Sequence, residues 1–398
     1  VAFCLGAEME FDLWYLVALP ALFAAGWLCR GFDRRQRSEK TQLPENFTRG
    51  VALLLDDEPD KAIDVLVEVC RLDPDLIELH HMLGKLFRRR GEFERAIRLH
   101  LHLVNRSDLS DADRTKALAE LAEDYFAAGL FDRAEAEYRK LSEVPSEHLG
   151  ALRRLLTIYT IEHEWESAID TVSAIEAQTG EDHRLETAHF YCERIEVALR
   201  SKRLDEAARL VAEVFPYADV TPRVDHLAGK VALAAGSVEK AAEHWRRLAH
   251  NFPAHTPLVI GELADAMAAL GQRDEALDLL RSALPEHPTA DALEAVIARV
   301  TEWRGLPEAE AIATKMLSAH PSLSAFNALV RLRAKANPED EQTKLLSGLL
   351  QRHAQRFARY QCTHCGFLAS NFAWHCLGCG SWDSFPPRRV EDAKGKSR

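Results

Sequence analysis

A short motif that returns at regular intervals restricts the possible folds of this chain more than any other feature. Each copy has a bulky or turn residue, an acidic residue and an alanine, and an apolar residue usually follows. The motif alanines are Ala62, Ala96, Ala134, Ala168, Ala207, Ala241, Ala276 and Ala309. Their intervals are nearly equal, apart from two longer ones that end at Ala134 and Ala207, so the phase persists throughout. This pattern predicts a stack of like helical units rather than an irregular bundle.

The residues around the motif indicate pairs of antiparallel helices. A glycine that can end a helix precedes several copies, at Gly91, Gly129, Gly236, Gly271 and Gly305. Prolines close several second helices, at Pro74, Pro145, Pro253 and Pro288. The acidic residue suits the start of the second helix, and the small alanine suits a close helix crossing. The two longer intervals predict extra residues around Ser107–Asp113 and Glu147–His163.

A period of roughly 34 residues is that of the tetratricopeptide repeat. We therefore predict an all-α superhelix over residues 44–357, whose last helix pair, Ser322–Arg356, caps the array. Such arrays usually bind peptides or proteins on a concave face that the first helices line. The candidate contacts are His80, Lys85, Arg88, Arg153 and Arg154. The alternatives are a passive spacer and ordinary solvated charges.

Four cysteines near the C-terminus predict a separate metal-binding domain over residues 358–387. Cys362, Cys365, Cys376 and Cys379 follow the pattern C-x2-C-x10-C-x2-C, and a glycine follows each pair. Two such turns can place four thiolates tetrahedrally around one ion. A segment this short depends on the metal for much of its folding free energy. We expect Phe367, Phe372, Trp374 and Trp382 to pack around the site and against the last helices.

The identity of the metal stays open between zinc and iron. The C-x-x-C-G turns resemble the knuckles of rubredoxin, which hold one iron, but the spacer between them is much shorter here. Zinc is favoured for a closed structural site of four thiolates. His364 and His375 are not needed as ligands, and Cys70 and Cys192 are interpreted as core residues within helices. A disulfide is disfavoured because the expected compartment is reducing.

An N-terminal segment has the character of a membrane anchor. Residues 13–29 carry no charge and are long enough to span a bilayer as a helix, with tryptophans near both ends. The preceding residues 1–12 are acidic, whereas five basic residues lie in the following linker, residues 30–43. The positive-inside rule then places the bulk of the chain in the cytoplasm. A single-pass inner-membrane protein is predicted; a cleaved signal peptide and a buried helix are less favoured.

Charge and motifs exclude several function classes. The formal net charge of −12 disfavours nucleic-acid binding through phosphate neutralisation. The sequence contains no phosphate-binding loop, no H-E-x-x-H and no G-x-S-x-G. We therefore predict a protein that is not an enzyme. Residues 388–398 form a basic tail, for which a solvated segment is the simplest interpretation.

The order of anchor, repeats and cysteine turns resembles lipopolysaccharide assembly protein B of Gram-negative bacteria over essentially the whole chain from Met9. The most specific part runs from Tyr360-x-Cys362-x-x-Cys365-Gly366-Phe367 through Trp374-His375-Cys376-x-x-Cys379. The resemblance implies that Cys362, Cys365, Cys376 and Cys379 bind the metal.

The same resemblance implies a non-enzymatic inner-membrane adaptor. Members of this family act with the membrane-bound AAA+ protease FtsH to control degradation of the deacetylase that commits precursor to lipid A. They also associate with an inner-membrane regulator that senses lipopolysaccharide and with assembly components. Two alternatives remain: a membrane scaffold for envelope enzymes with no role in proteolysis, and a redox or nucleic-acid module built on the cysteine turns.

Overall fold

The computed structural model describes residues 46–390 except 54, 57, 73–75 and 358. The predicted anchor, residues 13–29, the linker and the tail residues 391–398 lie outside the described residues. Among the helices that are described, none is long and apolar enough to cross a membrane. The chain divides into two compact units, residues 1–158 and 159–398.

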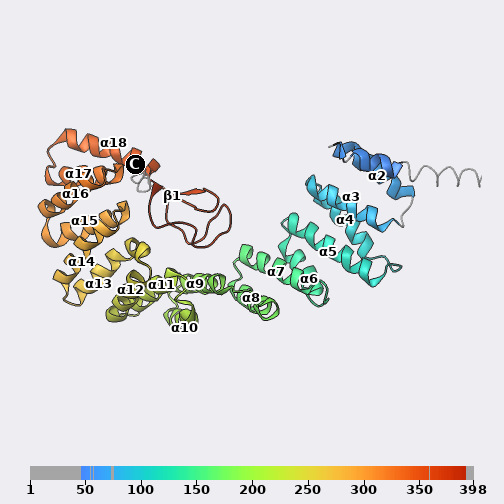
Figure 1. Cartoon of the computed structure of the whole chain (residues 1–398), viewed down its shortest axis with the longest axis horizontal. Helices are drawn as coiled ribbons and strands as arrows, with labels where there is room; N and C mark the ends of the chain where they lie inside the picture. Colours follow the sequence, from blue (N-terminus) through green and yellow to red (C-terminus); the bar gives the residue numbers. More distant parts are fainter. Residues whose placement is uncertain (1–45, 54, 57, 73–75, 358, 391–398) are drawn as a thin grey trace, which may run out of the picture. The chain divides into compact units, whose positions relative to one another are not determined.

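Unit 1 consists of antiparallel helices of similar length (Figure 1). They are α2 (Pro59–Leu72), α3 (Ile77–Arg89), α4 (Phe93–Val104), α5 (Asp111–Ala127), α6 (Phe131–Ser142) and α7 (His148–Glu162), which runs past the unit boundary. Helices α3 and α5 are the first helices of their hairpins, and α4 and α6 are the second helices. This alternation is the tetratricopeptide arrangement that the sequence predicts.

Unit 2 continues the same alternation and ends in a small non-helical segment. Its helices are α8 (Trp165–Thr179), α9 (Arg184–Arg200), α10 (Leu204–Val214), η1 (Phe215–Tyr217), α11 (Pro222–Ala234), α12 (Val238–Asn251), η2 (Pro253–Leu258), α13 (Ile260–Ala269), α14 (Arg273–Glu286), α15 (Ala290–Arg304), α16 (Leu306–Ala319), α17 (Leu323–Ala336) and α18 (Glu341–Phe357). Strands β1 (Tyr360–Gln361) and β2 (Leu368–Ala369) follow. The C-terminal segment lies inside the curve of α9 to α17 (Figure 1).

The repeat motif marks the second helices as predicted. Every copy begins at the first residue of a helix, as Phe93 does in α4 and Leu204 in α10. All eight motif alanines have no exposed surface, which fits the close crossing of the two helices. The five glycines before the motif have positive φ angles between 72° and 95°, a conformation that side chains with a Cβ rarely adopt.

One predicted irregularity is confirmed and the other is wrong. The longer interval from Ala96 to Ala134 contains the non-helical residues 105–110 before α5, which overlap the expected Ser107–Asp113. The longer interval from Ala168 to Ala207 does not arise in Glu147–His163. Its extra residues lie after α8, where Gly180 adopts a φ of 70° and ends the helix before α9 begins. A left-handed glycine thus sets this loop.

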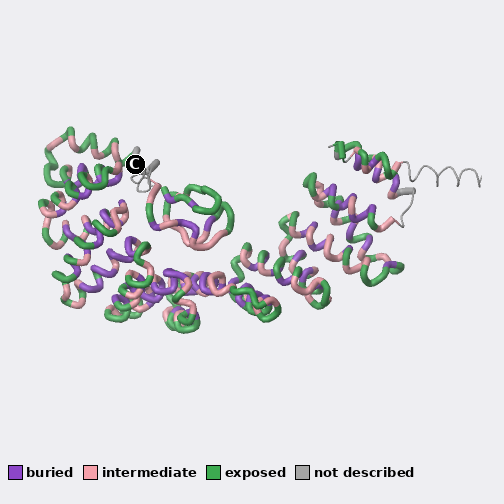
Figure 2. The backbone as a smooth tube through the Cα atoms, in the orientation of Figure 1, coloured by how far each residue is buried: buried purple, intermediate pink, exposed green. Residues whose placement is uncertain are grey.

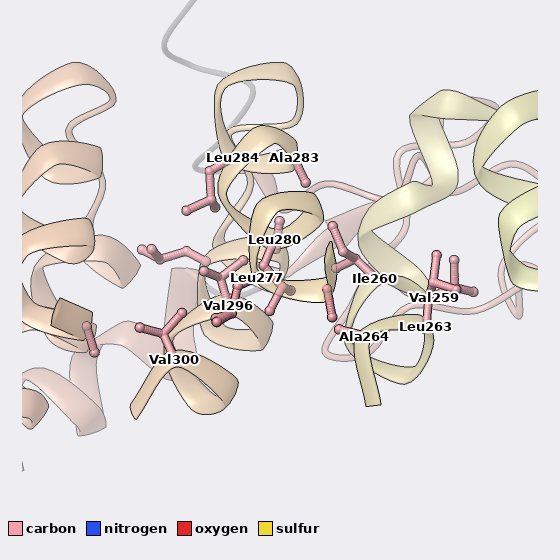
Figure 3. Close-up of a cluster of buried hydrophobic side chains, with 14 of the residues drawn as sticks. Val259, Ile260, Leu263, Ala264, Leu277, Leu280, Ala283, Leu284, Val296 and Val300 are labelled. Atoms are coloured by element: carbon pink, nitrogen blue, oxygen red, sulfur yellow. The ribbon is translucent and has the colours of Figure 1, made fainter. Parts of the chain in front are cut away.

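The core of the array lies between successive helix pairs (Figure 2). In unit 2 one cluster of buried side chains extends from α12 to α17, and Figure 3 shows its part between α13, α14 and α15. Glycines on the first helices leave space for large side chains of the second helices. A Cβ on Gly229 in α11 would lie only 2.3 Å from the Trp245 indole of α12, so the indole fits there because residue 229 has no side chain. Gly84 in α3 makes the same room for His100 of α4. Cys192 is buried in the core, as predicted.

Candidate metal centre

Two similar turns, which we call the knuckles, build the C-terminal ribbon, residues 360–390. In the first knuckle the Cys362 N–H donates to the Phe367 carbonyl at 2.9 Å, and the Gly366 N–H donates back to Cys362 at 3.0 Å. The second knuckle repeats the latter bond between Gly380 and Cys376. Both glycines have positive φ, 78° and 72°, so the tight return of the chain needs residues without a Cβ.

The knuckles bring four sulfur atoms to one point. The Sγ atoms of Cys362, Cys365, Cys376 and Cys379 all lie within 4.8 Å of one another. Cys362 Sγ lies 3.8 Å from Cys379 Sγ, and Cys365 Sγ lies 3.7 Å from Cys376 Sγ. A tetrahedral ion about 2.3 Å from each sulfur requires sulfur atoms roughly 3.8 Å apart. The separations fit a metal ion and are too long for disulfide bonds.

The surroundings of the sulfurs also fit thiolate ligands. The N–H groups of His364 and Gly378 point at Cys362 Sγ and Cys376 Sγ, each at 3.4 Å, and such donors stabilise negative charge on sulfur. His364 Nδ1 lies instead 2.9 Å from the Ser381 hydroxyl. Within the described residues, these four cysteines form the one group of His, Cys, Asp and Glu side chains close enough to hold an ion.

The other two described cysteines do not share this chemistry. Burial raises the pKa of Cys192 to about 12 and the pKa of Cys70 to about 11. Both thiols therefore stay protonated at neutral pH, whereas metal binding and nucleophilic attack require the thiolate. They serve as small apolar groups within the helical core.

The ribbon docks on the helices of unit 2 first through Trp382. The indole stacks on the imidazole of His189 in α9, with ring centroids 4.5 Å apart and planes 12° apart. The His189 Nε2 atom also lies 3.2 Å from a carboxylate oxygen of Asp383. Arg223 of α11 places its guanidinium over the same indole and is held by two carboxylates of α9, Glu193 and Glu196.

A second contact joins Trp374 to the middle of unit 2. Its ring stacks on His255 of η2 with centroids 6.0 Å apart and lies 6.1 Å from the ring of His226 in α11. Burial lowers the pKa of His255, so the ring that faces Trp374 is neutral at physiological pH. The contact is therefore a packing interaction between aromatic surfaces.

A third contact fastens both ends of the ribbon to α15. The Tyr360 hydroxyl, at the start of the ribbon, donates to Asp291 at 2.5 Å. Arg389, near its end, donates to the other oxygen of Asp291 at 2.7 Å and lies 3.4 Å from Glu294. A further hydrogen bond runs from Arg389 to the Ser324 hydroxyl of α17.

These contacts correct two expectations. The aromatic residues do not pack only against the last helices, because Trp382 and Trp374 reach α9, α11 and η2. Phe367 lies beside Gly378 of the second knuckle, around the site as expected, and stays 40% exposed. The solvated interpretation is wrong for Arg389, since its guanidinium is largely buried and shares Asp291 with Tyr360. The physical reason is the curve of the array, which brings distant first helices to the same side.

The docking residues follow a periodic signal that the motif analysis did not use. Counted back from the motif alanine of each repeat, His189, Arg223 and Asp291 occupy one and the same position. His226 and Glu294 share a second position, one helical turn later. Both positions therefore lie on the same side of each first helix. Polar and aromatic side chains recur there because that side faces the ribbon instead of the helical core.

Replacing Tyr360 by phenylalanine should weaken this fastening without unfolding the ribbon. Burial and the hydrogen bond to Asp291 raise the pKa of the Tyr360 hydroxyl, so it remains a neutral donor. Loss of one buried hydrogen bond costs about 1–2 kcal/mol. Hydrogen exchange of the β1 amides should quicken while metal content stays unchanged; unaltered exchange would contradict a fastening role.

The predicted partner contacts lie in unit 1 and remain predictions. His80 is 8% exposed, and its Nδ1 lies 2.9 Å from the Leu76 carbonyl. Lys85 and Arg88 pair with Glu120 of α5, and Arg88 also pairs with the buried Asp124. Arg154 pairs with Glu123 and lies over the Phe126 ring. Arg153 is exposed on α7.

Fold and site together define a class: a tetratricopeptide-repeat protein with a four-cysteine metal ribbon docked on its helices. Residues 360–387 match the family described as rubredoxin metal binding domain, and residues 79–115 and 226–291 match tetratricopeptide repeats. The chain is 32% identical over 380 residues to lipopolysaccharide assembly protein B of Escherichia coli K12, covering 94% of this chain and 97% of that protein. This chain belongs to the lipopolysaccharide assembly protein B family.

Two further similarities complete the comparison. The protein of the same name from Haemophilus influenzae is 26% identical over 384 residues, which are 93% of this chain and 96% of that protein. A solved tetratricopeptide repeat protein from Parabacteroides merdae is 16% identical, with a TM-score of 0.34 over 64% of this chain and 97% of its own.

Proposed function

We propose that this protein is a non-enzymatic, membrane-anchored adaptor in lipopolysaccharide assembly. The observation that carries the proposal is the 32% identity over 94% of the chain to a protein named for lipopolysaccharide assembly. A helical array with a docked structural ribbon also suits an adaptor, because its surfaces are built for binding. The adaptor promotes degradation of the deacetylase that commits precursor to lipid A, by an FtsH-type protease in the same membrane.

The ribbon's part in this function is structural, and zinc is its proposed metal. Four thiolates at tetrahedral spacing leave no open coordination position, whereas catalytic zinc sites keep one. The ion, when bound, supplies the folding free energy that the short ribbon lacks. Cys362 and Cys376 are buried against the ribbon core, while Cys365 and Cys379 face solvent.

The proposed anchor explains why adaptor and protease meet. Residues 13–29 are apolar and uncharged, and basic residues follow them. Two proteins anchored in the same membrane diffuse in two dimensions instead of three, which raises their effective concentration for each other. The inner membrane is therefore the proposed location, with the repeats and ribbon on the cytoplasmic side. A lipopolysaccharide-sensing membrane regulator is a further proposed partner.

Deletion of the gene should lengthen the lifetime of the deacetylase severalfold, because the protease loses its adaptor. The measurement is an immunoblot chase after translation is stopped. The full chain, supplied in trans, should restore rapid turnover. A chain that starts at Pro44 should stay helical and fail to restore it, since it lacks the anchor.

Each result separates the candidate functions. A deacetylase lifetime that deletion leaves unchanged would refute the proteolytic role and favour the scaffold that only gathers envelope enzymes. Full restoration by the chain from Pro44 would contradict the need for an anchor while leaving the proteolytic role intact. A comparable amount of both chains in the cell, measured by immunoblot, is the control.

A further inference from the structure

A pocket lies beside the docked ribbon, and of its lining only Glu294 takes part in the contacts described above. It is a cavity of about 280 Å³ between α15 and α17, the first helices of the last two hairpins. Glu294 and Thr301 of α15 and Arg331 and Lys335 of α17 supply its polar lining. Arg389 of the ribbon reaches Glu294 at one side, so the pocket adjoins the ribbon on the same side of the array.

The charges at this pocket are unbalanced in favour of cations. Arg331 and Lys335 are exposed, and neither has an ion-pair partner among the residues that the structure describes. Glu294 is the one acidic residue of the lining, and Arg389 already lies 3.4 Å from its carboxylate. Two uncompensated cations one helical turn apart are notable in a chain whose formal net charge is −12.

A third basic residue of α17, on the opposite side of the helix, does have an ion-pair partner. Arg333 lies between Arg331 and Lys335 in the sequence, yet it pairs with Glu310 of α16 at 2.8 Å. Helix α17 therefore pairs the cation that faces α16 of the preceding hairpin, whereas the two cations that line the pocket have no ion-pair partner within the described residues. An anionic group of a bound partner would supply the missing ion pairs of Arg331 and Lys335.

The remaining lining describes the rest of the ligand. Ile297, Ala298, Ala328 and Leu332 give the pocket an apolar part, which suits an aliphatic side chain. The Thr301 hydroxyl of the lining is buried and has no hydrogen-bond partner within the described residues. A buried hydroxyl without a partner is uncommon in folded proteins and indicates that a hydrogen-bonding partner is missing.

We propose that this pocket binds a protein segment in which a carboxylate adjoins an aliphatic residue. Arg331 and Lys335 hold the carboxylate, since charge-assisted hydrogen bonds are the stronger ones at such a site. The apolar lining takes the aliphatic side chain. The carboxylate belongs either to a free C-terminus or to an aspartate or glutamate within the segment. The pocket stands on its own geometry, beyond the proposed role in proteolysis.

The test uses the full chain in detergent and fluorescence anisotropy. The probe is a short fluorescein-labelled peptide that contains two aspartates and ends in leucine with a free carboxylate. Arg331→Gln and Lys335→Gln should each weaken its binding roughly tenfold, the loss expected for one charge-assisted hydrogen bond. Arg333→Gln is the matched control, because it removes the same charge from the same helix outside the pocket.

The binding of the three variants decides for or against the proposed site. Weaker binding by the Arg331 and Lys335 variants, with unchanged binding by the Arg333 variant, supports the site. Equal weakening by all three variants indicates general attraction of charge and overturns it, as does absence of binding to the unaltered chain. An amidated version of the peptide identifies the source: its loss of binding assigns the terminal carboxylate, and its retention assigns the acidic side chains.

Discussion

A chain with serine in place of Cys376 is expected to lose its metal and to unfold the ribbon while the helices persist. Cys376 has no exposed surface, and its sulfur lies 3.7 Å from that of Cys365. Structural zinc contributes about 10–16 kcal/mol of apparent binding free energy in small zinc-finger peptides, as much as the whole stability of an ordinary domain. Replacement of one thiolate by a hydroxyl removes most of that contribution.

The unfolded ribbon should also leave its docking surface. Trp382 and Trp374 then lose their stacked histidines, so their fluorescence should shift toward that of exposed indole. The helices remain because the stability of a repeat array comes mostly from neighbouring units. Metal analysis should find about one ion per unaltered chain and little in the variant, and far-ultraviolet circular dichroism should change only slightly.

A second cysteine variant of the same chain serves as the control for Cys376→Ser. Cys70→Ser removes a half-buried thiol of α2 that lies in unit 1, and it should keep full metal content. A Cys376→Ser chain that retains its metal, its ribbon fold and its activity would contradict the structural interpretation of the site. Retained metal with lost activity would instead indicate that the sulfur has a further role.

Replacement of Trp245 by alanine is expected to lower the free energy of unfolding of unit 2 by about 3–5 kcal/mol. Trp245 has no exposed surface and fills the space that Gly229 leaves on α11. Its indole N–H also donates to the His226 carbonyl at 3.3 Å. Since α11 carries Arg223 and His226, the cavity should loosen the surface on which the ribbon docks.

The measurements are urea denaturation and hydrogen exchange. Exchange should quicken in α11, in α12 and in the ribbon amides near Trp382. Trp303→Ala is the control, because Trp303 is only partly buried and contacts the Arg273 guanidinium at 5.8 Å. Its loss should be smaller than that of Trp245→Ala, because Trp303 packs against the core only in part and keeps some exposed surface. Equal losses in the two variants, or an unchanged ribbon with Trp245→Ala, would contradict the coupling of α12 to the docking surface.

The local elements of this protein are determined by the sequence alone. The second helices begin where the motif begins, at Phe93, Phe131 and Trp165. An acidic residue in the first turn favours the positive end of a helix, and a small residue allows the close helix crossing. The knuckles follow in the same way from cysteine and glycine spacing. Four sulfurs within 4.8 Å of one another are what two C-x-x-C-G turns can produce.

Only the tertiary structure decided where the ribbon sits and which charges remain uncompensated. His189 and Asp291 occupy the same position of their repeats, but this periodicity does not show that the ribbon docks on that side of the first helices. Their meeting with Trp382 and Arg389 depends on the curvature of unit 2, which accumulates from small rotations between successive repeats. A periodic sequence determines the repeating unit, whereas contacts between distant units depend on the sum of those rotations.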